Sequence, residues 1–367
     1  MSNKHLDITV KIDIIASNGS FGFGVPLILV TKAETEIPFT KVSGIKEVLD
    51  LLCGGEDDET TKKLCMQSET YRTAKLLFMQ DNAPSEIAIC HSTEGAETAI
   101  MGIEEKDWRQ LICIFGTGDT ADEEDVADTI ESLDYKMYYL TTDDVAVASA
   151  IKEKGYDRTV MYFYDKEEKD DIIVVGEDGK VTESEETYIP NAVAALIGES
   201  AGREVGSFTY KNLILKGITA LDKTTNELSQ IDGANAITNI EKCGDNVTTE
   251  GKCASGEYID IIDSIDYIIG NMEYRVQKLL NNSPKIPYTD SGIGSIESEV
   301  KGVLEMAYRN GIIADDAEGL PMYQTNFKSR SQMSAQDRAN RIYTGGNFRF
   351  DLAGAIHKVS VQGELVI

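Results

Sequence analysis

The residue types that most often perform chemistry are few in this 367-residue chain and lie far apart. Its three histidines are His5, His91 and His357, and none belongs to an HxxxH pair or lies beside paired carboxylates. A protein metal site needs such ligands at close, regular spacings. Cys90-His91 is a lone thiol–imidazole pair at the end of an expected strand, where an ordinary strand end is favoured over a nucleophile. The sequence therefore predicts no catalytic residue and no metal site.

One glycine-containing turn, Gly116-Thr117-Gly118-Asp119, lies where phosphate-binding loops lie, after an expected strand and before an expected helix. It lacks the third glycine and the spacing of GxGxxG, and GxxxxGK[ST] occurs nowhere in the chain. We interpret it as a turn ending in an N-cap aspartate, and no cofactor is expected. The alternative is a nucleotide-binding α/β enzyme that uses this turn, which predicts saturable nucleotide binding by a monomer.

The composition limits the classes of protein to which this chain could belong. Hydrophobic residues make up 41% of the chain and charged residues 27%, enough apolar material for packed cores. No apolar run approaches the roughly 18 residues of a membrane span, and the start, MSNKHLDITVKID, lacks the apolar segment of a signal peptide. We therefore expect synthesis in a cytoplasm and no membrane insertion. A net charge of −28 argues against nucleic acid as a partner.

The charge is unevenly distributed. Residues 323–367 carry six basic and three acidic side chains, a net +3 that leaves −31 on the first 322 residues. Arg338 and Arg341 are three apart in a short expected helix, 334–341, where they would share a face, and Ser334 is a suitable N-cap. A basic end on an acidic body suggests an acidic partner. Chance clustering on a solvated face is the alternative.

The six cysteines (53, 65, 90, 113, 243 and 253) are scattered and form no CxxC pair. A chain made in the cytoplasm is expected to keep them reduced. Cys243 and Cys253 flank a turn-rich stretch and could face one another across a hairpin, but free thiols are favoured there too.

Strands alternating with helices predict an α/β fold. Expected strands are 24–30, 86–90, 109–115, 135–140, 158–164, a stretch around 208–218 and one within 235–243; 165–186 reads as an exposed hairpin or loop. Expected helices are 43–52 (opened by Ser43), about 60–80, 122–133, 189–202, 260–280 and about 293–309. The run 260–280 has the strongest helical periodicity in the chain.

Both ends of the chain alternate apolar and polar residues with a period of two, as strands do. The apolar positions of these two arms are Leu6, Ile8, Val10, Ile12 and Ile14 at the start, and Val359, Val361, Leu365 and Ile367 at the end. A lone strand is unstable in water and must join a sheet. The two arms either pair within one molecule or add to the sheet of a neighbouring molecule; the pattern does not distinguish these.

The second half of the chain resembles the tail sheath proteins of contractile phage tails and of R-type, phage-tail-like bacteriocins. The resemblance rests on an ordered series of segments that covers most of residues 200–367. They are GSFTYKNLILKGITAL (206–221), GANAITNIEKC and its continuation (233–268), KIPYTDSGIGSIESEV (285–300), RNGIIADDAEG (309–319) and MSAQDRANRIYTGGNFRFDLAGAIHKVSVQGELV (333–366).

This resemblance implies a compact two-domain subunit with extended strand arms. The divisions would be an arm at 1–20, a variable α/β domain at 21–200, a sheath core domain at 201–350 and a second arm at 351–367. Stacked six-subunit rings would surround an inner tube, with the arms joining neighbouring copies. The partners implied are other copies of the chain, the tube protein, and baseplate and tail-terminator proteins, in a particle released by lysis. Another tail or baseplate structural protein is a second alternative.

The resemblance also places a basic segment near the C-terminus against the tube before contraction. The matching residues here are Lys328, Arg330, Arg338 and Arg341. No catalytic residue is implied, in agreement with the search above.

Overall fold

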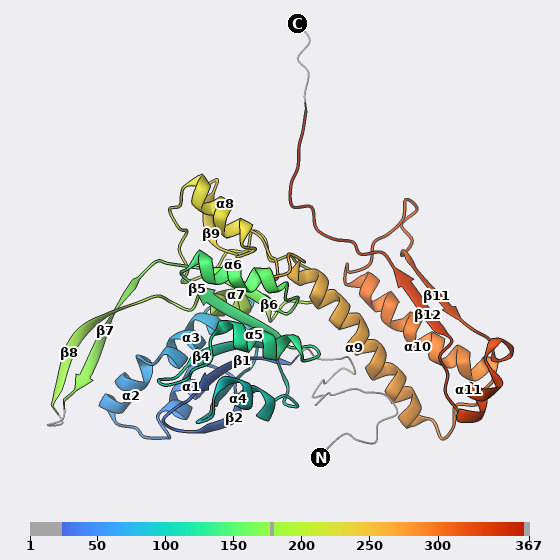
Figure 1. Ribbon diagram of the computed structural model, residues 1–367, viewed down its shortest axis with the longest axis horizontal. Helices are drawn as coiled ribbons and strands as arrows, with labels where there is room; N and C mark the ends of the chain where they lie inside the picture. The colour runs from blue at the N-terminus through green and yellow to red at the C-terminus, as the bar shows by residue number, and fades with distance from the viewer. Residues whose placement is uncertain (1–23, 177–179, 363–367) are drawn as a thin grey trace, which may run out of the picture.

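The computed structural model of the protein describes residues 24–176 and 180–362. Its larger lobe is built on a six-stranded sheet in the order β2-β3-β1-β4-β5-β6, parallel throughout except for β2 against β3 (Figure 1). The strands are β1 (Val25–Thr31), β2 (Ile37–Val42), β3 (Ile87–His91), β4 (Trp108–Phe115), β5 (Met137–Thr142) and β6 (Thr159–Phe163). The predicted α/β class is confirmed.

Helices cover both faces of this sheet, as a parallel sheet requires. Helix α3 (Glu69–Phe78) packs against α7 (Ala192–Ser200), and α4 (Ala96–Gly102) packs against α5 (Glu123–Glu131). Right-handed crossovers place these two pairs on opposite faces. The remaining helices of this lobe are α1 (Ile45–Leu52), α2 (Glu59–Met66), α6 (Val145–Lys154) and α8 (Thr225–Gly233).

Three predicted elements differ in the structure. The single helix expected over about 60–80 is two helices, because Ser68 leaves the helical conformation and its hydroxyl accepts a hydrogen bond from the Tyr71 amide at 3.3 Å, capping α3. Helix α1 is preceded by Gly44 rather than opened by Ser43. The strand expected around 208–218 is irregular chain, because Asn212 and Gly217 have positive φ angles that interrupt an extended run.

The predicted hairpin is formed by β7 (Glu168–Val175) and β8 (Val181–Tyr188), which project from the larger lobe (Figure 1). A second short hairpin, β9 (Asn239–Lys242) and β10 (Asp245–Thr248), lies on the larger lobe. Cys243 is exposed at its turn, whereas Cys253 is buried, and all six cysteines are free thiols.

A smaller lobe is formed by the end of the described chain. The long helix α9 (Ile259–Asn282) crosses from the larger lobe and packs against α10 (Asp290–Arg309), and a two-stranded antiparallel sheet, β11 (Tyr323–Phe327) and β12 (Gly346–Phe350), covers α10 (Figure 1). Both predicted long helices are confirmed. Between the strands lie a 3₁₀ turn (Arg330–Gln332) and α11 (Ala335–Asn340).

Two clusters of buried apolar side chains follow these lobes. The first extends along the chain from Leu27 to Ile259, and the second from Tyr267 to Ile313. The α9 helix therefore links the two cores. The domain division at residue 200 stays a prediction.

Candidate inter-subunit and tube-facing surfaces

The basic segment expected to meet a partner lies between β11 and β12, at the outer end of the smaller lobe. Its helix α11 begins as predicted: the Ser334 hydroxyl accepts a hydrogen bond from the Asp337 amide at 3.0 Å. Across this segment the side chains of Lys328, Arg330 and Arg341 are exposed, and within the described residues none of them makes a hydrogen bond or ion pair. Three free cations are thus presented together along one short stretch of chain.

Arg338 and Arg341 do not share a helix face, so that part of the sequence argument is wrong. Helix α11 ends at Asn340, and Arg341 follows it in the left-handed conformation with φ 60°. The Arg338 guanidinium turns inward instead, where it donates to the backbone carbonyl of Arg330 at 3.2 Å and to that of Met333. Arg338 therefore stabilises the fold of the basic segment, while Arg341 is available to a partner.

The two strand arms lie largely beyond what the structure describes. Leu6, Ile8, Val10, Ile12 and Ile14 fall outside the described residues, as does Leu365. Val359 and Val361 are described, and they are 79% and 88% exposed in extended chain that pairs with no described strand. Their assignment to an inter-subunit arm stays a prediction.

A sheet that could receive such an arm is present in the smaller lobe. In β11, Tyr323 and Thr325 face α10, where they donate hydrogen bonds to Glu305 at 3.4 Å and Glu297 at 2.7 Å. The sheet has only two strands among the described residues, so each strand keeps an outer edge of unpaired backbone groups. Unpaired edges are the usual docking sites for an added strand.

The sequence argument missed a buried ion network that joins the two lobes. Arg109 at the start of β4 donates to Asp263 at 2.5 Å and to Asp266 at 2.8 Å, both on α9. Arg158 also binds Asp266, at 2.9 and 3.1 Å, and the Tyr210 hydroxyl donates to Asp263 at 2.8 Å. Buried charges need this complete pairing, because an unpaired charge in a core is strongly destabilising.

The same network explains why α9 buries polar side chains. Asp263, Asp266 and Asn271 are buried, whereas Ile265 and Ile269 on the same helix are 38% and 39% exposed. The signal in the sequence was the spacing of Asp263 and Asp266, which puts two carboxylates on one helix face. Only their partners in the sheet, distant in sequence, make that face the buried one.

The turn at 116–119 lies at the point where the strand order of the sheet reverses, the usual ligand crevice of a doubly wound fold. Gly116 is needed there because a Cβ atom would lie 2.1 Å from the Thr31 carbonyl oxygen. The predicted turn is confirmed, but its N-cap is Asp122 rather than Asp119. The Asp122 carboxylate accepts from the amides of Glu124 and Asp125 at 3.0 and 3.1 Å. The chain's own carboxylate thus occupies the place that a phosphate would take.

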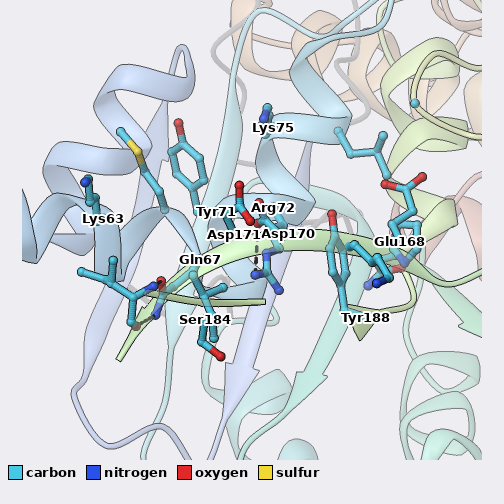
Figure 2. Close-up of a pocket in the computed structure, with 18 of the residues that line it drawn as sticks. Lys63, Gln67, Tyr71, Arg72, Lys75, Glu168, Asp170, Asp171, Ser184 and Tyr188 are labelled. Atoms are coloured by element: carbon cyan, nitrogen blue, oxygen red, sulfur yellow. Dashed lines mark hydrogen bonds and ion pairs between the residues drawn. The ribbon is translucent and has the colours of Figure 1, made fainter. Parts of the chain in front are cut away.

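A cavity of about 710 Å³ separates the β7–β8 hairpin from α2 and α3 (Figure 2). Arg72 lies at its centre, 3.2 Å from Asp170 and 2.8 Å from Glu186, with its guanidinium 4.2 Å from the centre of the Tyr188 ring. The Gln67 amide exchanges two hydrogen bonds with the backbone of Ile173, at 2.9 and 3.0 Å. These polar groups pair with one another across the cavity, and the contacts hold the hairpin against α2 and α3.

This architecture is similar to that of known proteins. Residues 259–365 match the family described as E217 tail sheath protein gp31-like, C-terminal domain. That range includes α9, α10, the β11–β12 sheet and the basic segment. No curated protein sequence matches the chain significantly.

Solved structures match almost the whole chain. A chain of the anti-feeding prophage baseplate matches with a TM-score of 0.63 at 14% identity, covering 98% of both chains. The sheath complex of an extracellular contractile injection system, PVC, in its contracted state matches with 0.64 at 12% identity, covering 94% of this chain and 92% of that one. The sheath tail protein of Listeria innocua matches with 0.53 at 10% identity, covering 84% and 90%.

The protein thus has the fold seen in solved structures of contractile sheaths, and its residues 259–365 match the family model of a tail sheath C-terminal domain. The resemblance predicted from the ordered segments is confirmed. None of the helices in the described part of the chain is both long enough and apolar enough to cross a bilayer.

Proposed function

We propose that this chain is the structural subunit of a contractile sheath, in which stacked six-subunit rings surround an inner tube and contract to drive it through a target cell envelope. The observation that carries the proposal is the fold shared over 94–97% of the chain with sheaths solved in the contracted state. The sheath C-terminal domain at 259–365 supports it independently.

Neighbouring copies are the first partner. The receiving sheet of the smaller lobe, β11 and β12, has two open edges among the described residues, and the alternating residues of both arms could supply the strands it lacks. A lattice of such exchanged strands would keep subunits joined while they rotate between two interface states.

The inner tube is the second partner. Lys328, Arg330 and Arg341 are exposed and free of partners within the described chain, and they would meet an acidic tube surface before contraction. Exposed ion pairs are worth about 0–1 kcal/mol each. Because these weak ion pairs repeat over many subunits, the total attraction between sheath and tube would be strong, and it could still be released cooperatively.

The remaining partners are baseplate and tail-terminator proteins at the two ends of the sheath, with no role for nucleic acid or for insertion into a membrane. The subunit would be made in a bacterial cytoplasm and released by lysis in a phage tail or phage-tail-like particle. We assign it no catalytic activity, because the solved structures it matches are parts of contractile sheaths and their baseplate.

Negative-stain microscopy of the purified full-length chain tests the proposal. Striated tubes or stacked rings are expected. A protein that stays as discrete small particles at high concentration, with or without a coexpressed tube protein, contradicts it. Saturable nucleotide binding by those particles would instead support the enzyme alternative.

A further inference from the structure

The chain that follows β12 returns from the smaller lobe to the larger one (Figure 1). Leu352 forms an isolated bridge with Ile313, and the Ala353 amide donates to the Ile312 carbonyl at 2.9 Å. From there the chain has no regular structure, yet one side chain in it is held firmly. That side chain is His357.

His357 inserts into a polar socket on the larger lobe and is only 11% exposed. Its Nδ1 is 2.9 Å from a Glu250 carboxylate oxygen, and its Nε2 is 3.1 Å from the Thr209 hydroxyl. The ring also packs edge-on against Tyr258, with centroids 4.8 Å apart at 80°. We call these contacts the His357 clasp.

The apolar neighbours of His357 along the chain are exposed, in contrast to its buried ring. Ile356 is 86% exposed, and Val359 and Val361 are exposed to a similar degree. The clasp is therefore a single fixed point between the sheet of the smaller lobe and the exposed apolar stretch beyond.

Histidine suits this position because its ring offers one nitrogen to each of two polar partners. A neutral imidazole can donate from Nδ1 to Glu250 and accept at Nε2 from the Thr209 hydroxyl, and a protonated ring can donate to both. Lys211 binds the other oxygen of Glu250 and orients that carboxylate. Asp260, on the first turn of α9, is a second carboxyl group near the ring.

We propose that His357 is a positioning residue that fixes the root of the C-terminal arm, so that the arm exchanged between subunits comprises residues 358–367. This rests on the proposed sheath function. A fixed root directs the chain that follows it, of which 358–362 are described, toward one neighbouring sheet. Because the clasp lies on the larger lobe and β12 on the smaller, tension on the arm is shared by both lobes.

Hydrogen exchange of the free subunit tests the clasp itself. His357→Ala should speed exchange of the Ala353 amide and its neighbours about tenfold or more, with exchange in the six-stranded sheet unchanged. Glu250→Ala should have the same effect, and combining both changes should add little, since either one opens the clasp. Ser360→Ala, an exposed change three residues away, is the matched control and should leave exchange as it is.

Assembly tests the positioning role. The concentration of free subunit in equilibrium with sheaths should rise several-fold for His357→Ala and stay unchanged for Ser360→Ala. If exchange at 352–357 is unaltered in His357→Ala, the clasp is refuted. If exchange rises but the equilibrium concentration does not, the positioning role is refuted while the sheath function stands. If the unmodified chain forms no sheath, the proposed function fails, and this assignment fails with it.

Discussion

The guanidinium of Arg109 and the carboxylate of Asp266 lie 2.8 Å apart and join the parallel sheet of the larger lobe to the helix that carries the smaller lobe. Both side chains are almost completely buried. The angle between the two lobes is therefore set by groups with one well-defined geometry. In a sheath subunit that moves as a rigid body, such a joint would transmit force between the lobes without bending.

Asp266→Ala should lower the free energy of unfolding by about 3–5 kcal/mol, because it removes the buried carboxylate that both Arg109 and Arg158 bind and leaves Arg109 with Asp263 alone. Chemical denaturation of the free subunit measures the change. Lys169→Ala, which removes an exposed ion pair with Glu185 on the projecting hairpin, is the control and should cost no more than about 1 kcal/mol. Equal effects of the two variants would show that the joint contributes no special stability.

The joint should also weaken in acid. Burial alone raises the pKa of Asp266, but the charges of Arg109 and Arg158 and their hydrogen bonds outweigh it and hold the pKa below its ordinary value of 3.8. A group whose pKa falls on folding adds stability above its unfolded pKa, and that stability is lost as the pH falls through the lower folded value. Stability measured from pH 6 downward should therefore decline below about pH 4 less steeply in Asp266→Asn than in the unmodified chain.

Asp260 should behave in the opposite sense. Burial raises the pKa of this carboxyl, and one of its oxygens is buried without a hydrogen-bond partner. Its contribution is present at low pH and is lost as the pH rises through the raised pKa, so the charged form is a cost at neutral pH. Asp260→Asn should increase stability at pH 7 and make little difference near pH 3. A loss of stability at pH 7 would contradict this account.

Arg341→Glu should weaken binding between sheath and tube while leaving the subunit folded, since Arg341 is exposed and pairs with no described residue. Particles should carry sheaths that are missing or already contracted, and the defect should be greatest when Lys328 and Arg330 are changed as well. Arg338→Glu is expected to unfold the basic segment, because its guanidinium supports two backbone carbonyls.

Lys46→Glu, an exposed change on α1, controls for the charge change of Arg341→Glu. Normal extended tails in the triple variant Lys328→Glu, Arg330→Glu, Arg341→Glu would refute the tube-facing assignment. Low-salt cosedimentation with tube protein separates lost binding from lost folding.

Deleting residues 1–14 should leave a soluble, folded subunit that no longer forms long sheaths, because this removes all five alternating apolar positions of the first arm. Circular dichroism checks the fold and electron microscopy checks assembly. Sheaths of normal length from the shortened chain would show that the arm is not needed.

Much of the architecture followed from local pattern. Short apolar runs such as 86–90 predicted buried strands, the spacing within 260–280 and 293–309 predicted the two long helices, and Ser334 predicted the start of α11. These features depend on residues near one another in the chain, where periodicity and capping act directly. The ordered segments beyond residue 200 likewise predicted the sheath resemblance.

The tertiary structure decided which distant residues meet, which the local sequence pattern does not contain. That α9 buries Asp263 and Asp266 depends on Arg109 and Arg158, more than 100 positions away, because these charges pair with the two carboxylates. His357 is unremarkable in sequence, and it becomes an anchor only because Thr209, Glu250 and Tyr258 meet around it. Arg341 does not share a face with Arg338 because Arg341 itself takes the left-handed conformation that ends α11. In the first two cases the deciding contact joins groups that the sequence places far apart. In the third the deciding feature is a backbone angle that side-chain spacing does not encode.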